Sequence, residues 1–196
     1  MELTEVLRRR RMVRAYDPRP VPAAALDAIM AAALRAPSAG FTQGVSLLVL
    51  TAAGDRETFW RITASRESGW LRGMRTAPAL LLVWTNMEAY LDRYAEPDKG
   101  WTDRDVDRWS APYWFVDGGM ASLAALLAGV DQGLGGCFFG VPADRIGAVR
   151  EAFRVPSDQL SVGVISLGYP AAGSSAGSPG RRSRRAAEEL IHRGRW

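Results

Sequence analysis

The chain has 196 residues, of which 47% are apolar and 23% are charged, which is the ordinary composition of a folded globular domain. A chain of this length buries about 70% of its unfolded surface, so its core needs neither disulfides nor a metal. Cys137 is the only cysteine and His192 the only histidine, which excludes an intrachain disulfide framework and a conventional zinc site.

The net charge of +4 is distributed unevenly along the chain. Residues 1–19 carry six arginines and three acidic residues, giving +3, and residues 181–196 carry six arginines and two acidic residues, giving +4. Residues 20–180 are left with −3. Two arginine clusters at the ends of an acidic body argue against a uniformly basic nucleic-acid-binding protein.

Hydrophobic periodicity and helix breakers predict the elements of the N-terminal half. We expect helices over residues 2–10, 23–35 and 55–65, separated by a proline-rich extended segment at 17–22 and a loop that begins at Pro37. The continuous apolar runs at 45–51 and 79–85 have the length of buried strands.

Residues 86–112 are polar and aromatic, and we expect short helices and loops that form an insertion. The insertion is either a lid that roofs a pocket and sets the choice of acceptor, or a surface elaboration or dimer contact. Residues 113–130 predict the longest helix, apolar almost all round and therefore central and buried.

The C-terminal part predicts strands at 137–139 and 160–168, with a helix between them that ends near Phe153. Residues 171–180 contain only Ala, Gly, Ser and Pro, which is typical of a flexible linker, and a final helix is expected at 185–192. The mixed order predicts a single α+β domain over 1–196, with a central, mostly antiparallel sheet flanked by helices.

No apolar run approaches the roughly 18–20 residues of a membrane span, and the N-terminus lacks the apolar region of a signal peptide. We therefore expect a cytoplasmic protein that binds neither membrane nor nucleic acid.

Two arginine clusters are candidate anion sites, because paired guanidinium groups fork onto phosphate oxygens. The first contains Arg10, Arg11 and Arg14, and the second contains Arg182 and Arg184. Each cluster taken alone also fits a solvated basic run, a targeting patch or a disordered tail. A folded chain with a flexible linker can bring both clusters to one anion.

Two loops rich in small residues, 37–44 and 133–136, each precede a predicted strand and let a planar ligand approach the backbone closely. Arg72 and Arg75, just before the second strand, are candidates to stabilise negative charge on a ligand, or else mark a surface helix end. No P-loop, G-x-G-x-x-G, G-x-S-x-G or H-E-x-x-H motif is present, and His192 is expected to make a structural contact rather than act in catalysis.

Five segments together resemble the nitroreductase-like flavoprotein family. RRRRMVRAYDPRPVP resembles its basic opening, and ALRAPSAGFTQG at 33–44 resembles its A-x-x-A-P-S-x-x-x-x-Q loop. GLGGCFFGVP at 133–142, ISLGYP at 165–170 and RRSRRAAEELIHRGRW at 181–196 resemble the glycine turn with its strand, the penultimate strand and the basic C-terminal ending. The resemblance covers nearly the whole chain in order.

The resemblance implies that the chain binds FMN. It implies phosphate contacts from the N-terminal cluster and from the basic pair near the C-terminus, ring contacts from the 37–43 loop across a homodimer interface, and contacts near flavin N5 from the strand end. The residues so implied are Arg10, Arg11, Met12, Arg14, Pro37, Ser38, Ala39, Gln43, Arg72, Phe139, Gly140, Arg182 and Arg184. No metal ligand and no catalytic side chain is implied, because the flavin carries the redox chemistry.

The function implied is ping-pong hydride transfer from NADH or NADPH through FMN to a nitroaromatic, quinone or related small acceptor, in a homodimer with swapped termini. Met12, Phe41, Gly44 and Phe139 depart from residues common in the family, which leaves the substrate open. The alternatives are a flavin-storage protein without turnover, a member with specialised chemistry (dehalogenation, benzimidazole formation from flavin, deazaflavin-dependent reduction), and a basic-ended nucleic-acid-binding protein.

Overall fold

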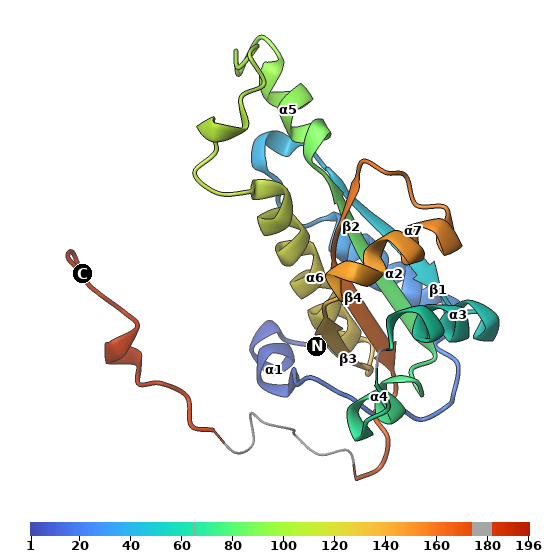
Figure 1. Cartoon of the computed structure of the whole chain (residues 1–196). Coiled ribbons are helices and arrows are strands. Elements are labelled where there is room, and N and C mark those ends of the chain that lie inside the picture. The colour runs from blue at the N-terminus through green and yellow to red at the C-terminus, as the bar shows by residue number, and fades with distance from the viewer. Residues whose placement is uncertain (65, 174–181) are drawn as a thin grey trace.

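A four-stranded sheet forms the centre of the computed structural model, which describes residues 1–64, 66–173 and 182–196 (Figure 1). Its strands are β1 (Val45–Leu50), β2 (Ala79–Asn86), β3 (Gly135–Phe139) and β4 (Gln159–Gly168), in the spatial order β1-β2-β4-β3. All three pairings are antiparallel, which confirms the predicted α+β fold. The edge strands β1 and β3 lie on opposite sides of the sheet.

Both faces of the sheet are covered, which is why its strands read as continuous apolar runs rather than as alternating ones. Along β2, Leu80, Leu82 and Trp84 belong to one core cluster, whereas Leu81 and Val83 belong to the other. Side chains alternate between the faces of a strand, so each face receives its own hydrophobic layer.

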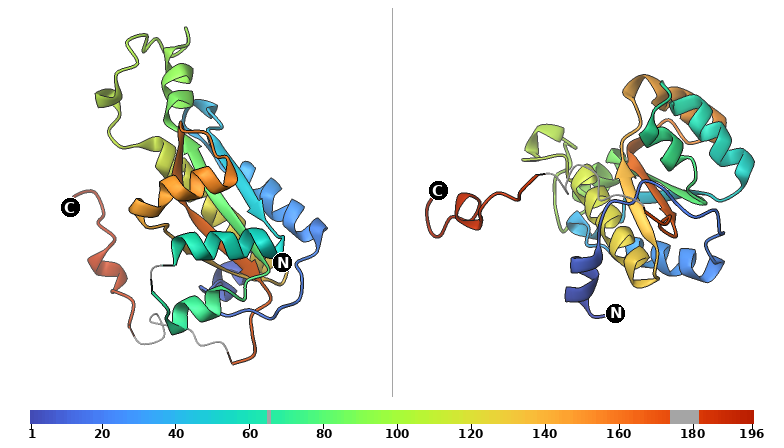
Figure 2. Two further views of the ribbon diagram at one scale, coloured as in Figure 1. Left: turned by 45° about the vertical axis from the view of Figure 1, so that its right-hand side comes forward. Right: turned by 90° about the horizontal axis from the view of Figure 1, so that it is seen from below.

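The helices divide between these two faces (Figure 2). The core on one face is completed by α2 (Ala23–Leu34) and α6 (Tyr113–Asp131), with α1 (Leu3–Arg9) packed on α6. The core on the other face is completed by α3 (Ala53–Thr63), α4 (Gly69–Met74) and α7 (Ile146–Phe153). The insertion forms α5 (Met87–Ala95) and a short 3-10 turn at Val106–Arg108, at one end of the molecule (Figure 1).

Helix α6 is less buried than its composition predicts. Asp117, Ala121 and Ala125 are buried against the sheet side, but Phe115 and Leu123 are exposed on the opposite side of the helix. By length and composition, α6 is apolar enough to cross a membrane, whereas the sequence predicted no segment of that kind. Half of its most apolar 18-residue stretch is buried inside the protein, as in the core helix of a soluble domain. The prediction of a helix buried all round is therefore wrong.

One further expectation needs correction, and one helix was missed. The predicted helix at 185–192 is only a single turn, Ala187–Glu189, because Leu190, Ile191 and the rest of 182–196 are exposed and pack on no core. Helix α4 was not predicted from the sequence. The predicted linker at 171–180 lies mostly outside the described residues.

Candidate flavin site

The N-terminal arginine segment, residues 10–14, lies along the free edge of β3. Met12 forms a parallel bridge with Gly136, and the Val13 N–H donates to the Gly136 carbonyl at 2.9 Å. A Cβ on Gly135 would lie 2.4 Å from Val13 Cγ2, so the close approach requires glycine there. The glycine turn and the basic opening, 120 residues apart in the chain, therefore form one edge of the sheet.

Tyr16 anchors the end of this segment in the core. Its hydroxyl donates to the Val13 carbonyl at 2.6 Å and lies 2.7 Å from Ser166 Oγ, while its backbone N–H donates to Thr76 Oγ1 at 2.8 Å. Burial raises the pKa of Tyr16, which keeps the hydroxyl protonated as a donor. These bonds fix the backbone from which Arg14 projects.

Helix α4 packs directly against the same segment. A Cβ on Gly73 would lie 2.1 Å from the Arg14 carbonyl oxygen, so the two backbones are in contact. The helix begins at an N-cap, Ser68, whose Oγ accepts from the Leu71 N–H at 3.1 Å. Arg72, a predicted site residue, is exposed on this helix, and Arg75 forms an ion pair with Glu67 at 3.1 Å.

An aromatic cavity of about 210 Å³ lies at the C-terminal end of β3. The Phe139 ring stacks on Trp60 at 5.5 Å with an interplanar angle of 13°, and Trp70 meets its edge at 5.6 Å. Trp60 is 5% exposed, and its buried Nε1 has no hydrogen-bond partner among the residues that the structure describes. The residues lining the cavity are Phe59, Trp60, Thr63, Ala64, Arg66, Ser68, Trp70, Leu71, Phe139, Gly140 and Pro142.

The structure therefore brings together several of the predicted site residues. Arg10, Met12 and Arg14 are half-buried beside β3, Arg11 is exposed in the same segment, and Arg72 lies on the adjoining helix. Phe139 and Gly140 line the cavity at the end of the strand. A basic backbone edge thus leads to an aromatic cavity.

The 37–43 loop, by contrast, lies away from this edge. It leads into β1, and β1 and β3 are opposite edge strands, three strand spacings apart. At about 4.8 Å per spacing this is roughly 14 Å across the sheet. Pro37, Ser38, Ala39 and Gln43 therefore do not line the cavity of their own chain.

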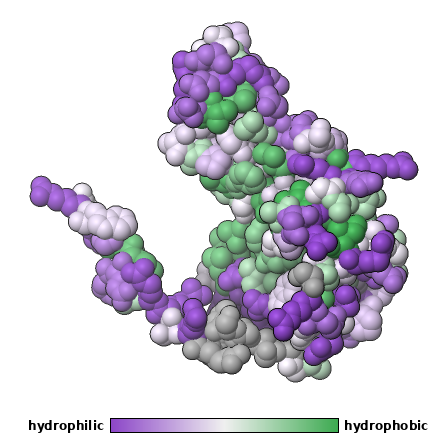
Figure 3. All heavy atoms as spheres, viewed as in Figure 1, coloured by the Kyte–Doolittle hydropathy of each residue, from purple (hydrophilic) through white to green (hydrophobic). Residues whose placement is uncertain are grey.

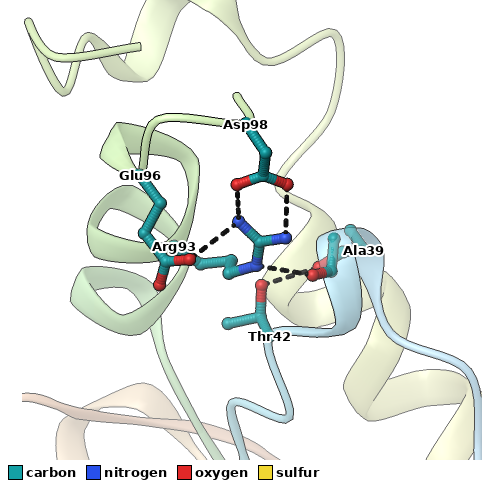
Figure 4. A network of polar contacts seen from close by, with 6 residues as sticks. Ala39, Thr42, Arg93, Glu96 and Asp98 are labelled. Atoms are coloured by element: carbon teal, nitrogen blue, oxygen red, sulfur yellow. Dashed lines mark hydrogen bonds and ion pairs between the residues drawn. The ribbon is translucent and has the colours of Figure 1, made fainter. Parts of the chain in front are cut away.

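Side chains of α5 and α6 hold this loop. The Ala39 N–H donates to Asp117 Oδ2 at 2.8 Å, and Arg93 Nε donates to the Gly40 carbonyl at 2.8 Å (Figure 4). Sequence reasoning missed Asp117 and Arg93. The available signal for Asp117 was a carboxylate inside an apolar helix, whose other acidic residue, Asp131, stands at its last position.

Arg182 and Arg184 also lie apart from the N-terminal arginines. The 182–196 arm leads away from the body in every view, and its residues are exposed (Figures 1 and 2). Within the arm His192 stacks on Trp196 at 4.2 Å, the structural contact expected for this histidine. Within the described ranges, no group of three or more His, Cys, Asp and Glu side chains could hold a metal ion.

The sequence model of the nitroreductase family matches residues 7–169. The chain belongs to the nitroreductase family. This nitroreductase-family chain is 30% identical over 173 residues (87% of it, 78% of the relative) to a Methanothermobacter thermautotrophicus protein provisionally named as an NADH dehydrogenase/NAD(P)H nitroreductase. It is 26% identical over 192 residues (98% of it, 73% of the relative) to the oxygen-insensitive NADPH nitroreductase of Salmonella typhimurium.

Solved structures show the same fold for this member of the family. A provisionally named nitroreductase from Desulfovibrio desulfuricans, in complex with FMN, superimposes with a TM-score of 0.75 at 22% identity, covering 100% of this chain and 98% of the other. The NADPH:FMN oxidoreductase of Vibrio harveyi, complexed with NAD⁺, gives a TM-score of 0.73 at 20% identity, covering 99% and 77% of the two chains. The nitroreductase-like fold predicted from the sequence is confirmed.

Proposed function

We propose that this protein is an FMN-dependent NAD(P)H oxidoreductase that reduces a small-molecule acceptor such as a nitroaromatic or a quinone. The observation that carries the proposal is the arginine segment bonded along β3, which leads to the aromatic cavity at Phe139 and Gly140. Bound FMN supplies the redox chemistry, accepting a hydride from NADH or NADPH and passing reducing equivalents to the acceptor. Membership of the family and the names of the relatives support the same assignment.

The residues present fit FMN in two respects. FMN carries a phosphate, and Arg10, Arg11 and Arg14 lie on one short backbone segment from which guanidinium groups can fork onto its oxygens. FMN also carries a planar ring, and the cavity offers the aromatic walls of Trp60, Trp70 and Phe139 against which such a ring can pack. Met12 contributes backbone rather than a hydroxyl to the phosphate end, and Arg72 on α4 is the candidate cation for the ring.

We propose further that the active form is a homodimer. The 37–43 loop and the β3 edge lie on opposite sides of one sheet, so a ligand that contacts both must lie between two protomers. Exposed apolar side chains gather on the hollow side of the molecule, where α6 presents Tyr113, Phe115, Val116 and Leu123 (Figure 3). The residues of the 182–196 arm are exposed, and in a dimer this arm would bring Arg182 and Arg184 to the partner. A cytoplasmic location stays a prediction.

Comparing FMN with riboflavin tests the phosphate assignment, because the two ligands differ only in the phosphate. Wild-type apoprotein is expected to bind FMN at least tenfold more tightly than riboflavin by fluorescence titration. The double variant Arg10→Ala/Arg14→Ala should lose that preference. Arg8→Ala/Arg9→Ala is the charge-matched control, because these arginines pair with Glu5 on α1. A double variant that retains stoichiometric FMN contradicts the assignment.

Anaerobic stopped-flow reduction separates the oxidoreductase from a flavin-storage protein. The flavin absorbance of the FMN-loaded protein should bleach on mixing with NADH or NADPH and return on addition of a quinone. If neither nucleotide bleaches the flavin but a reduced deazaflavin does, the protein is an oxidoreductase but the assignment of NADH or NADPH as its reductant is wrong. If none of the three bleaches it, the enzyme assignment fails.

A further inference from the structure

The 37–43 loop has an unusual backbone. Gly40, Phe41 and Gln43 have φ of 61°, 57° and 56°, in the left-handed region that non-glycine residues rarely adopt. Phe41 is 76% exposed, so packing within its own chain does not compensate for its conformation. A large apolar ring is thus displayed to solvent on a strained backbone.

A charged side chain from each of α5 and α6 supports this conformation, and Figure 4 shows the α5 side chain, Arg93. Arg93, which donates to the Gly40 carbonyl, is itself fixed by two bonds to Asp98 of 2.7 and 2.8 Å and one to Glu96 of 3.1 Å. Thr42 Oγ1 donates to the Ala39 carbonyl at 2.6 Å, which closes the turn from within. The peptide groups before and after Gly40 therefore have fixed partners.

The second support comes from α6. Asp117 is 1% exposed, and its Oδ2 accepts from both the Ala39 N–H and the Tyr90 hydroxyl, the latter at 2.7 Å. Burial, followed by the hydrogen bond to Asp117, raises the pKa of Tyr90, which keeps that hydroxyl a donor. A Cβ on Gly40 would lie 2.7 Å from the Tyr94 ring, so α5 also limits the loop sterically.

A strained backbone conformation persists only where contacts with the surrounding structure hold it in place, and residues with strained backbones cluster at functional sites. We infer that Phe41 forms an aromatic wall of the acceptor site that completes the partner protomer's flavin site, and that it selects planar aromatic acceptors by stacking. Asp117 and Arg93 are positioning residues that hold the loop in the displaying conformation. This inference rests on the proposed function, because it assigns a substrate class to that same site.

A ring without hydrogen-bonding groups distinguishes acceptors by their flat apolar face and not by their polar substituents. The selection should therefore separate quinones and nitroaromatics from non-aromatic oxidants. The competing role for Phe41 is simple packing against the partner protomer, which would make it a determinant of dimerisation and leave acceptor selection unchanged.

Steady-state kinetics on the FMN-loaded enzyme distinguish the two roles. With a naphthoquinone as acceptor, Phe41→Leu should raise KM about three- to tenfold, whereas Phe41→Tyr should stay near the wild-type value. With ferricyanide, which has no aromatic face, neither variant should change KM. Equal effects on both acceptors, no effect on either, or loss of the dimer on size exclusion would overturn the inference. Failure of the wild-type protein to bind FMN or oxidise NAD(P)H would instead refute the proposed function.

The positioning role of Asp117 has a readout that does not depend on catalysis. Asp117→Leu should remove the hydrogen-exchange protection of the Ala39 amide and raise the naphthoquinone KM as Phe41→Leu does. Asp117→Asn should retain both, because one amide oxygen can accept both bonds. Ser122→Ala is the matched control, because Ser122 is buried on the same helix and its hydroxyl donates to the Gly118 carbonyl of that helix.

Arg93→Met provides an independent test at a half-exposed position, should Asp117→Leu not fold. It removes the bond to the Gly40 carbonyl and should raise the naphthoquinone KM while leaving the ferricyanide KM unchanged. A wild-type KM in Arg93→Met, or an Ala39 amide that stays protected in a folded Asp117→Leu protein, contradicts the positioning role.

Discussion

Gly73 is the point at which α4 touches the backbone of the 10–14 segment, and its replacement by alanine tests that contact. The added Cβ would lie 2.1 Å from the Arg14 carbonyl oxygen, which belongs to backbone and cannot rotate away. Overpacking of this kind costs about 1–3 kcal/mol. Alanine is a better helix former than glycine by about 1 kcal/mol, which offsets part of the cost. We expect Gly73→Ala to reduce the free energy of unfolding by up to about 2 kcal/mol.

For a chain of this size, each kcal/mol corresponds to about 2–4 °C in Tm, so the Tm of the apoprotein should fall by up to roughly 8 °C. Differential scanning calorimetry of the apoprotein measures this directly, and FMN titration shows whether displacement of Arg14 also weakens binding. Gly147→Ala in α7 is the control, since a Cβ there meets nothing within 4 Å and should leave Tm unchanged or raise it. If Gly73→Ala raises Tm as the control does, α4 does not press on the segment and the reasoning is refuted.

Two further changes test the N-terminal region. Tyr16→Phe leaves the buried Val13 carbonyl without its side-chain donor and should cost about 1–3 kcal/mol in urea unfolding, with FMN affinity reduced as well; wild-type stability would contradict the anchor. Hydrogen bonds from Arg8 and Arg9 lower the pKa of Glu5 from 4.5 to about 2. The ionised Glu5 carboxylate therefore stabilises the fold fully above pH 4.5, and this stabilisation is lost as the pH falls toward 2. Glu5→Gln should show a shallower loss of stability between pH 5 and 2, and salt should reduce the difference because the pair is exposed.

The sequence predicted those elements whose hydrophobic signal is local. The run at 79–85 is buried on both faces, and the run at 45–51 is half-buried at the sheet edge, so the apolar composition of each identified it as a strand. Helix α4 was missed because it contains two glycines and only six residues, and it is held by its N-cap and by contact with Arg14. The helix expected at 185–192 is reduced to the turn Ala187–Glu189, because its apolar residues Leu190 and Ile191 are exposed and gain no stability from burial.

In the candidate site too, the sequence revealed the local motifs but not the contacts between distant segments. The arginine segment and the glycine turn were identified as separate motifs, but their union along β3 depends on the bridge between Met12 and Gly136, which no spacing encodes. The support of the 37–43 loop by Asp117 and Arg93 spans 78 and 53 residues, so only the folded chain reveals it.

The loop and the arginine segment lie on opposite edges of the sheet, and this placement determines which pairs of inactive variants can complement each other. In the proposed dimer, each flavin site takes its arginine segment from one protomer and its loop from the other. A protomer defective in the arginines and a protomer defective in the loop then form a mixed dimer with one intact site and one doubly defective site. Two inactive proteins, mixed and allowed to exchange subunits, would recover activity that neither has alone, and two variants damaged in the same segment would not.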